Sequence, residues 1–542
     1  MNLLIKNNIF YISLGTSISK LFGFLRQIII AAAFGVGISY DAFNYAYIIP
    51  GFLIIIIGGI NGPLHNAIVS ILTPVNYRQA GLVLTRVSIK LTLIFCLLGL
   101  IIFSKAIFII KLIGPNLDLQ TQQIASIQLQ ILSPCIPLSA FIGLSYGALN
   151  SKNKFFLSSF SPSFISLTTI LFILFAWITN NINFLNSNFF ESHILAISTL
   201  TGTIIQFSIQ IIQIYKIGLL RFESIWHGFF DEERRIFSLI IPASFSSGLG
   251  QINVFVDMFF ASSFPGAASG LAYGNFLIQA PLGILSNSLI LPLLPKISKL
   301  IKNEDIKFLQ KSLLSSIEYS FLTTFFLAGF FISFNEQIVE LVFQRGAFNY
   351  DATITVKKIL IAYAIGIPFY LYRDLLIRIY YAIDKTELPF KLSLIGILLN
   401  IGFDWILIGA PLINSGNFLP YNFGISGIVI ASGFVNFIIC LILSIKLKIK
   451  GIRLLNKFLI KQIFFISIGC FITSSFCIGI INLFRVKNQI FFVNAVIIGI
   501  GFIGYTAIYF VITKFLKVNK FKIKLNFFKK DLIKSVKNFF KI

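Results

Sequence analysis

Isolated charges within long apolar segments are the residues of this chain that could do chemistry. Lys20 and Arg26 lie in the stretch SKLFGFLRQIIIAAAFGVGISYDAFNYAYIIP (19–50), and Asp41 follows in its second half. Neither cation has an acid three or four residues away, the spacing at which helical side chains meet. Charge in an apolar segment is costly, so it usually faces a cavity or a partner. Arginine suits a diphosphate, because its fork donates two hydrogen bonds at once.

These charges also have structural interpretations. Arg26 could be tied to a backbone carbonyl or to Asp41 or Asp257, and Asp41 suits the positive end of a helix dipole as a cap. Asp374 and Arg378 are four residues apart and can neutralise one another. With both interpretations open, the candidate cavity residues for substrate binding are Lys20, Arg26, Asp41, Asp257, Arg373 and Arg378.

The composition places these charges in an all-α polytopic membrane protein. Of the 542 residues, 57% are hydrophobic and only 12% are charged, against about 45–50% and about 25% in soluble domains. Apolar runs long enough to cross a bilayer recur along the whole chain, and their continuity is unlike the alternation of a membrane β-barrel. Lys20 and Arg26 interrupt the first run, so we expect a retained helix and no cleaved signal peptide.

About fourteen transmembrane helices follow from these runs. One alternating set of connections, counted together with the adjoining span ends and both tails, carries 32 lysines and arginines, and the opposite set, counted in the same way, carries five. Positive charge favours the cytoplasmic side, and a missed helix would destroy this alternation, so both termini are predicted to be cytoplasmic. The predicted spans are 9–34, 41–73, 82–112, 121–150, 156–179, 192–217, 235–262, 267–295, 313–335, 353–383, 389–411, 421–446, 458–483 and 490–514.

An internal repeat divides the chain. YGALNSKNKFF (146–156) and YYAIDKTELPF (380–390) lie 234 residues apart, and Pro134 and Pro368 precede them at the same offset. The repeat predicts two six-helix lobes around a central cavity, with the substrate site between them and the two prolines as hinges. The predicted divisions are an N-terminal lobe (1–220), a C-terminal lobe (221–452), two extra helices (453–514) and a basic cytoplasmic tail (515–542).

Other chemistry finds little support. The five cysteines lie in apolar segments without metal-ligand spacing, the three histidines are scattered, and no P-loop or catalytic triad is present. We therefore predict no enzyme, no cofactor and no metal. The net charge of +25 is concentrated in the tail and cytoplasmic loops, which favours anionic membrane lipids over nucleic acid as partners.

The stretch 19–50, with QINVFVD (251–257), FQRGAF (343–348) and RDLLIRIYYA (373–382), resembles the MviN/MurJ family, the proposed lipid II flippases of the multidrug/oligosaccharidyl-lipid/polysaccharide exporter superfamily. The resemblance implies two helical bundles facing a central cavity, alternating access, and a lipid-lined groove formed with the two extra helices. It implies a diphosphate-linked glycopeptide lipid as substrate and functional charge at Lys20, Arg26 and Asp41. A monomer in the bacterial inner membrane is expected, or in a plastid membrane if the chain is organelle-encoded.

Two departures from the family pattern affect the substrate. Where many members have a basic residue in the second helix, this chain has IIII (54–57), and where many have Asp-Arg in the eighth, it has Asn275-Phe276. The cavity is expected to be less cationic, and GGINGP (58–63) resembles the cyanobacterial-type branch. The alternatives are an exporter of another polyprenyl-linked glycolipid, a multidrug-type exporter on the same scaffold, and a non-transporting membrane scaffold.

Overall fold

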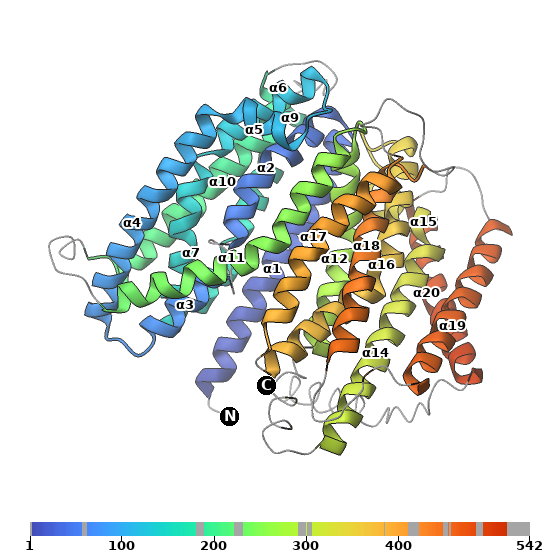
Figure 1. The fold of residues 1–542 in the computed structure, drawn as a ribbon. Coiled ribbons are helices and arrows are strands. Elements are labelled where there is room, and N and C mark those ends of the chain that lie inside the picture. The colour runs from blue at the N-terminus through green and yellow to red at the C-terminus, as the bar shows by residue number, and fades with distance from the viewer. Residues whose placement is uncertain are drawn as a thin grey trace. The chain divides into compact units, whose positions relative to one another are not determined.

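A computed structural model describes most of the chain (Figure 1). The described residues are 3–56, 62–179, 189–221, 231–290, 297, 300, 306–383, 385–409, 422–447, 454, 457–483 and 491–516. Within these ranges every regular element is a helix. Ile57, Asp384 and the tail from residue 517 onward, which entered the sequence-based predictions, lie outside them.

The helices follow the predicted spans, several of which are broken into two pieces. They are α1 (Leu3–Phe34), α2 (Ile38–Ile56), α3 (Pro63–Leu72), α4 (Tyr77–Ser104), α5 (Ala106–Ile113), α6 (Leu119–Leu132), α7 (Cys135–Ser151), α8 (Phe155–Phe160), α9 (Ser163–Ile178), α10 (Phe189–Lys216), α11 (Asp231–Ala261), α12 (Ala267–Leu285), the short π-helix η2 (Ser286–Ile290), α14 (Ile306–Ser333), α15 (Asn335–Phe343), α16 (Tyr350–Ala382), α17 (Glu387–Leu407), α18 (Ile425–Lys446), α19 (Lys457–Leu483) and α20 (Phe491–Phe515).

Each of the fourteen predicted spans contains helix, and the all-α membrane fold is confirmed. In the described part, nine single helices are long and apolar enough to cross a bilayer, and the pair α6–α7, bent by 45°, adds a tenth. The other predicted spans are in shorter pieces or contain more polar residues, so the count of fourteen stays a prediction.

Prolines mark two of the breaks within spans, and polar caps mark two helix starts between spans. Pro134 and Pro162 immediately precede α7 and α9, because a proline suits a helix start but cannot donate the hydrogen bond that a helix interior needs. Asn76 caps α4 by accepting from the Gln79 amide at 2.9 Å, and Asp118 caps α6 by accepting from the Thr121 amide at 3.0 Å. The predicted hinge Pro134 thus lies at the α6–α7 bend, whereas Pro368 lies inside the single helix α16.

The chain forms two compact units. Unit 1 comprises Met1–Tyr273, Phe343–Val356 and Ser393–Ile428, and unit 2 comprises Gly274–Val342, Lys357–Leu392 and Val429–Ile542. The two units are defined by contacts within the structure. The predicted lobes are defined by the sequence repeat, and they stay a prediction.

Small residues let the helices of unit 1 approach closely. A Cβ on Gly147 of α7 would lie 2.6 Å from the Ile68 side chain of α3, and one on Gly202 of α10 would lie 2.6 Å from the Ile165 Cα of α9. Lipid tails are as apolar as the helix surfaces, so the hydrophobic effect does not drive membrane helices together. They associate through close packing of this kind instead. Many serine and threonine hydroxyls donate to carbonyls three or four residues back, for example Ser145 to Phe141 at 2.7 Å.

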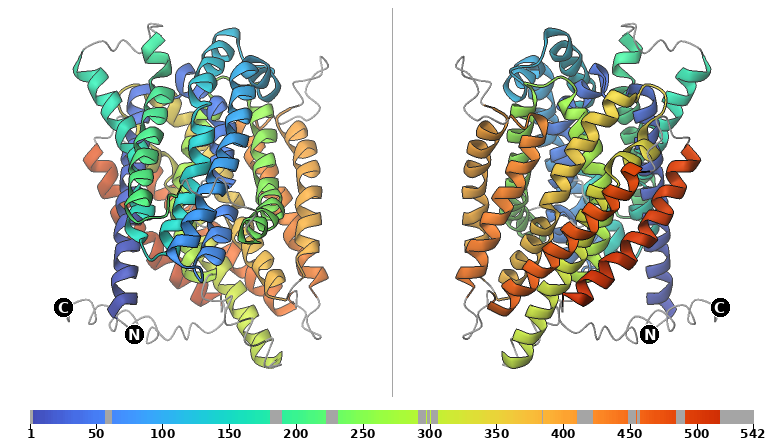
Figure 2. Two further views of the ribbon diagram at one scale, coloured as in Figure 1. Left: turned by 90° about the vertical axis from the view of Figure 1, so that its left-hand side faces the viewer. Right: turned by 90° about the vertical axis from the view of Figure 1, so that its right-hand side faces the viewer.

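In unit 2, the two C-terminal helices α19 and α20 pack along α14 (Figure 2). Tyr509 of α20 donates to the Leu322 carbonyl of α14 at 2.9 Å. A Cβ on Gly329 would overlap the side chains of Tyr505, Ser474 and Cys470. The glycine therefore sets how closely these three helices can pack.

Candidate functional site

Arg26 lies on α1 and has no counter-charge in the described part of the chain. Its side chain is partly buried, and its Nε is fully buried with no hydrogen-bond partner. The guanidinium lies close enough to Tyr40 and Tyr47 of α2 to interact with both electrostatically. The expected alternative, a tie to a carbonyl or to Asp41 or Asp257, has no counterpart among the described contacts. Arg26 is thus a cation available to an anion.

Aromatic rings line the part of α2 beside Arg26. Tyr40 and Phe43 stack with their centroids 6.4 Å apart, and Phe43 and Tyr47 at 5.5 Å. Gln27, the neighbour of Arg26, donates from its amide to the Tyr40 hydroxyl at 2.7 Å. These contacts hold the ring row of α2 against the segment of α1 that carries the arginine.

Lys20 lies on the same helix six residues earlier. Its side chain is exposed, and no hydrogen bond or ion pair holds it within the described ranges. Six residues correspond to about 9 Å along a helix axis. The two cations can therefore contact different parts of one elongated anionic ligand.

Asp41 caps a helix, which agrees with its structural interpretation. The capped helix is α12, however, and not α2, to which Asp41 belongs. It lies in the first turn of α2, and its Oδ1 accepts from the Ser269 backbone amide at 2.8 Å. Ser269 is in the first turn of α12, and the amides of Gly266 and Ala268 beside it also stabilise the carboxylate. A carboxylate at a helix N-terminus satisfies amides that the helix leaves free and complements its dipole.

The end of α1 is held by a second contact that explains the FQRGAF motif. The Ala347 amide donates to the Ala32 carbonyl at 2.8 Å. Gly346 has φ +57°, and a Cβ there would lie 2.3 Å from the Ala32 oxygen. The Tyr273 hydroxyl donates to the Gly35 carbonyl at 2.9 Å. Only glycine permits so close an approach at a left-handed backbone position.

Asp257 belongs to a cluster that the sequence analysis did not assemble. The Asn400 amide nitrogen donates to Asp257 Oδ1 and to Asp404 Oδ2, each at 2.8 Å. Asn400 and Asp404 are fully buried, and Asp404 Oδ1 accepts no hydrogen bond. The only available signal was the four-residue spacing of Asn400 and Asp404, which places them on one face of α17.

No lysine or arginine among the described residues forms an ion pair with Asp257 or Asp404. Two carboxylates that share one amide in an apolar interior cannot both remain charged without compensation. The arrangement can therefore hold a proton or a small monovalent cation, which neutralises one of the two acids. That chemistry differs from the predicted contact of Asp257 with a substrate, which stays a prediction.

The predicted cations of unit 2 have partners. Arg378 Nε lies 3.1 Å from Asp374 Oδ1, the pair expected from their spacing, and the Ser286 hydroxyl donates to the other Asp374 oxygen at 2.8 Å. Arg373 donates to the Asn436 side-chain oxygen. The charge of Arg378 is thus compensated by Asp374 before any ligand arrives, whereas the hydrogen-bond partner of Arg373 is a neutral amide.

Two other places bear on the distribution of charge: the contact of α4 with the start of α11, and Asn275 in α12. Lys90 and Arg86 of α4 both contact the buried carboxylate of Glu233 at the start of α11. In α12, this chain has Asn275 where many members of the family have an aspartate. The Asn275 side-chain oxygen accepts a hydrogen bond from the Gln279 side-chain amide at 3.3 Å, so the pair at this position is uncharged. The described residues contain no group of three metal-ligating side chains.

Long apolar helices that bury isolated, uncompensated charges define a membrane transporter. Comparison with solved structures agrees on the fold. The chain is similar to "Lipid II flippase MurJ, inward closed conformation" (TM-score 0.70, 24% identity, 96% of this chain and 99% of that one). It is also similar to the inward-facing conformation of a multidrug resistance MATE family transporter of the MOP superfamily (TM-score 0.63, 12% identity, 80% and 96%).

Sequence comparison identifies the family. The profile of the family described as "Lipid II flippase MurJ" matches residues 30–502. A Synechocystis protein named "Probable lipid II flippase MurJ" is 37% identical over 427 residues, 78% of each chain. One of the same name from Rickettsia prowazekii is 28% identical over 398 residues, 72% of this chain and 76% of that one. The chain belongs to the lipid II flippase MurJ family, which confirms the resemblance seen in its motifs.

Proposed function

We propose that this protein moves lipid II, the diphosphate-linked precursor of peptidoglycan, across a membrane by alternating access. The observation that carries the proposal is Arg26, a partly buried cation that has no counter-charge among the described residues, in a member of this family. An uncompensated charge at membrane depth costs free energy. A ligand that supplies two negative phosphates recovers that free energy when it binds.

In this mechanism Arg26 binds the diphosphate and Lys20 contacts a second part of the headgroup. The guanidinium fork of Arg26 donates two parallel hydrogen bonds to phosphate oxygens. Lys20, a compact charge on a flexible stem, follows the ligand without fixing its orientation. The neighbouring rings of Tyr40 and Tyr47 offer apolar faces with polar edges to a sugar.

Alternating access requires a contact that opens on one side of the membrane. The Asp41 bond to the start of α12 and the Ala347 bond to the end of α1 support such a role, since both connect α1 and α2 to later parts of unit 1. A hydrogen bond to a charged group is worth about 1.5–3 kcal/mol. Differential binding of a ligand can shift an equilibrium by that amount.

The orientation and location belong to the same proposal. The excess of positive charge on one set of connections supports cytoplasmic termini. The identity with the Synechocystis relative supports the cyanobacterial-type branch, in which a bacterial inner membrane or a plastid membrane is the location. We propose a monomer, because one chain carries all of the candidate residues.

Complementation tests the proposal. Cells depleted of their own flippase receive this chain as sole replacement, and lipid II is labelled with a reagent confined to the outer face. Restored labelling is the expected result. A chain that inserts into the membrane without restoring labelling contradicts the lipid II assignment and favours another glycolipid.

The tail separates transport from a scaffold role. A chain that ends at residue 516 should restore labelling nearly as well as the full chain, since the candidate residues all precede it. Loss of function on this truncation, with normal insertion, would favour the scaffold.

A further inference from the structure

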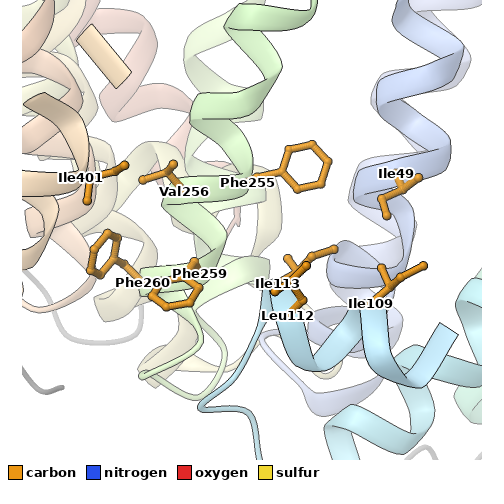
Figure 3. Close-up of a pocket in the computed structure, with 9 residues that line it drawn as sticks. All are labelled: Ile49, Ile109, Leu112, Ile113, Phe255, Val256, Phe259, Phe260 and Ile401. Carbon is orange, nitrogen blue, oxygen red and sulfur yellow. The ribbon is translucent and has the colours of Figure 1, made fainter. Parts of the chain in front are cut away.

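An apolar cavity in unit 1 has no charged residue in its lining (Figure 3). Its volume is about 450 Å³. Its walls come from α2, α5, α11 and α17, and hold only aliphatic and aromatic side chains. The lining residues are Ile49, Ile109, Leu112, Ile113, Phe255, Val256, Phe259, Phe260 and Ile401.

The cavity reaches the outer surface of the helices at α5. Leu112 is part of the wall and is 65% exposed, and Ile107 and Phe108 of the same short helix are also exposed. In a membrane protein such apolar residues face lipid. The cavity is therefore continuous with the surface that contacts bilayer lipids, and a hydrocarbon chain can enter without crossing a polar barrier.

The short helix α5, which carries the exposed wall residue Leu112, also carries a positive charge. Lys111, the residue before Leu112, is exposed and makes no hydrogen bond or ion pair with the described residues. The nearby acid Asp118 is engaged elsewhere, because it accepts from the amide of Thr121 at 3.0 Å and from its hydroxyl at 2.6 Å. An ammonium group at a membrane surface attracts lipid phosphate.

We propose that the cavity is a binding site for a bilayer glycerophospholipid, with one acyl chain among the lining residues and its phosphate against Lys111. The lining carries no group that could recognise a sugar or peptide, so the occupant is selected by its chain and its phosphate. Bilayer phospholipids supply both at far higher concentration than any carrier lipid. The site is separate from Arg26 and does not depend on which lipid the protein transports.

A photoreactive phosphatidylglycerol with a diazirine in one acyl chain tests this site. The full chain is reconstituted in vesicles of phosphatidylglycerol and phosphatidylethanolamine that contain this probe, irradiated and digested. We expect labelled peptides from 106–113 and 252–260. Label spread evenly over all lipid-exposed helices would overturn the proposal.

Matched variants locate the chain. Val256→Trp fills the cavity, whereas Val254→Trp on the same helix adds the same bulk at a residue that is exposed and outside the lining. Val256→Trp should exclude about two methylenes of the acyl chain from the cavity and so lower labelling of these peptides by about tenfold. Val254→Trp should leave the labelling unchanged. Equal labelling in both variants overturns the assignment. Ile109→Trp repeats the test from α5 if Val256→Trp lowers the yield of folded protein.

The phosphate contact has its own control. Lys111→Gln should lower labelling by about fivefold, and Lys105→Gln, an exposed lysine at the other end of α5, should not. Equal effects of the two substitutions would mean diffuse attraction and would overturn the phosphate contact. Displacement of the probe by a polyprenyl diphosphate at equal mole fraction would assign the cavity to a carrier lipid and overturn the choice of occupant.

Discussion

Arg26 and Arg378 were both predicted from sequence to bind substrate, and their surroundings differ. Arg378 in unit 2 has its carboxylate one helical turn away, with Nε 3.1 Å from Asp374. Arg26 in unit 1 buries its Nε atom, which has no hydrogen-bond partner in the described ranges of the chain. The acid closest to Arg26 in the sequence, Asp41, is engaged with the Ser269 amide at the start of α12. Two arginines of similar appearance in the sequence thus carry different amounts of available charge.

The acids differ in the same way. Asp374 has a cation and a hydroxyl as partners, whereas Asp404 shares the amide of Asn400 with Asp257 and has no cation in the part of the chain that the structure describes. Compensated pairs are compatible with a structural role. Uncompensated groups mark where an exchangeable ligand or ion supplies the missing charge.

The largest effect is expected at Arg26. Arg26→Ala should lower transport about a hundredfold or more while the chain still inserts, because it removes the charge-assisted bonds to the diphosphate. Arg26→Lys should retain part of the activity, since charge remains but the fork is lost. The readout is outer-face labelling of lipid II per inserted molecule. An Arg26→Ala variant that transports as well as wild type would remove the distinction between the two arginines.

A smaller effect, about tenfold on transport, is expected at the uncompensated acids. Asp404→Asn removes one of the two carboxyls, so the cluster no longer needs a proton or cation. We expect transport measured in vesicles to respond to an imposed proton or monovalent-cation gradient in the wild type, and to lose that response in this variant. Asp257→Asn should act alike, and the double variant should be little worse than either one. An unchanged ion response in both single variants would contradict this account.

The position of α1, which carries Arg26, is tested at the FQRGAF turn. Gly346→Ala forces a side chain into a left-handed position 2.3 Å from the Ala32 carbonyl oxygen, at a cost of about 1–2 kcal/mol. The melting temperature of the purified protein should fall. Gly23→Ala is the control and should not lower the melting temperature, because nothing lies within 4 Å of the added Cβ and alanine favours a helix interior over glycine. If the Gly346→Ala variant melts at the same temperature as the wild type, the turn does not constrain α1.

The smallest effect is expected at the compensated pair. The side chains of Arg378 and Asp374 are 28% and 38% exposed, and an i,i+4 pair of this kind is worth about 0.5 kcal/mol or less. A double-mutant cycle with Arg378→Ala and Asp374→Ala, followed by thermal unfolding, should give a coupling of that size. A loss of transport in Arg378→Ala as large as in Arg26→Ala would place the two arginines in the same class.

Much of the fold could be predicted from sequence, because apolar runs, loop charges and proline positions are local properties. The helices at all fourteen spans and the Asp374–Arg378 pair follow from patterns within one segment. The breaks that set off the short α5 and α8 were missed, since hydropathy averages over these helices and does not detect a local change of helix direction, whereas Pro134 lies at the α6–α7 bend.

The sequence by itself determined that this is a helical membrane protein of one family and which residues carry charge in its apolar segments. Only the tertiary structure decided which of those charges are compensated. Asp41 reaches the amide of Ser269, 228 residues away, and Asn400 joins Asp257 to Asp404. Such pairings depend on the packing of separate helices. Spacing along one helix can predict a partner one turn away, but it cannot predict a partner from another helix.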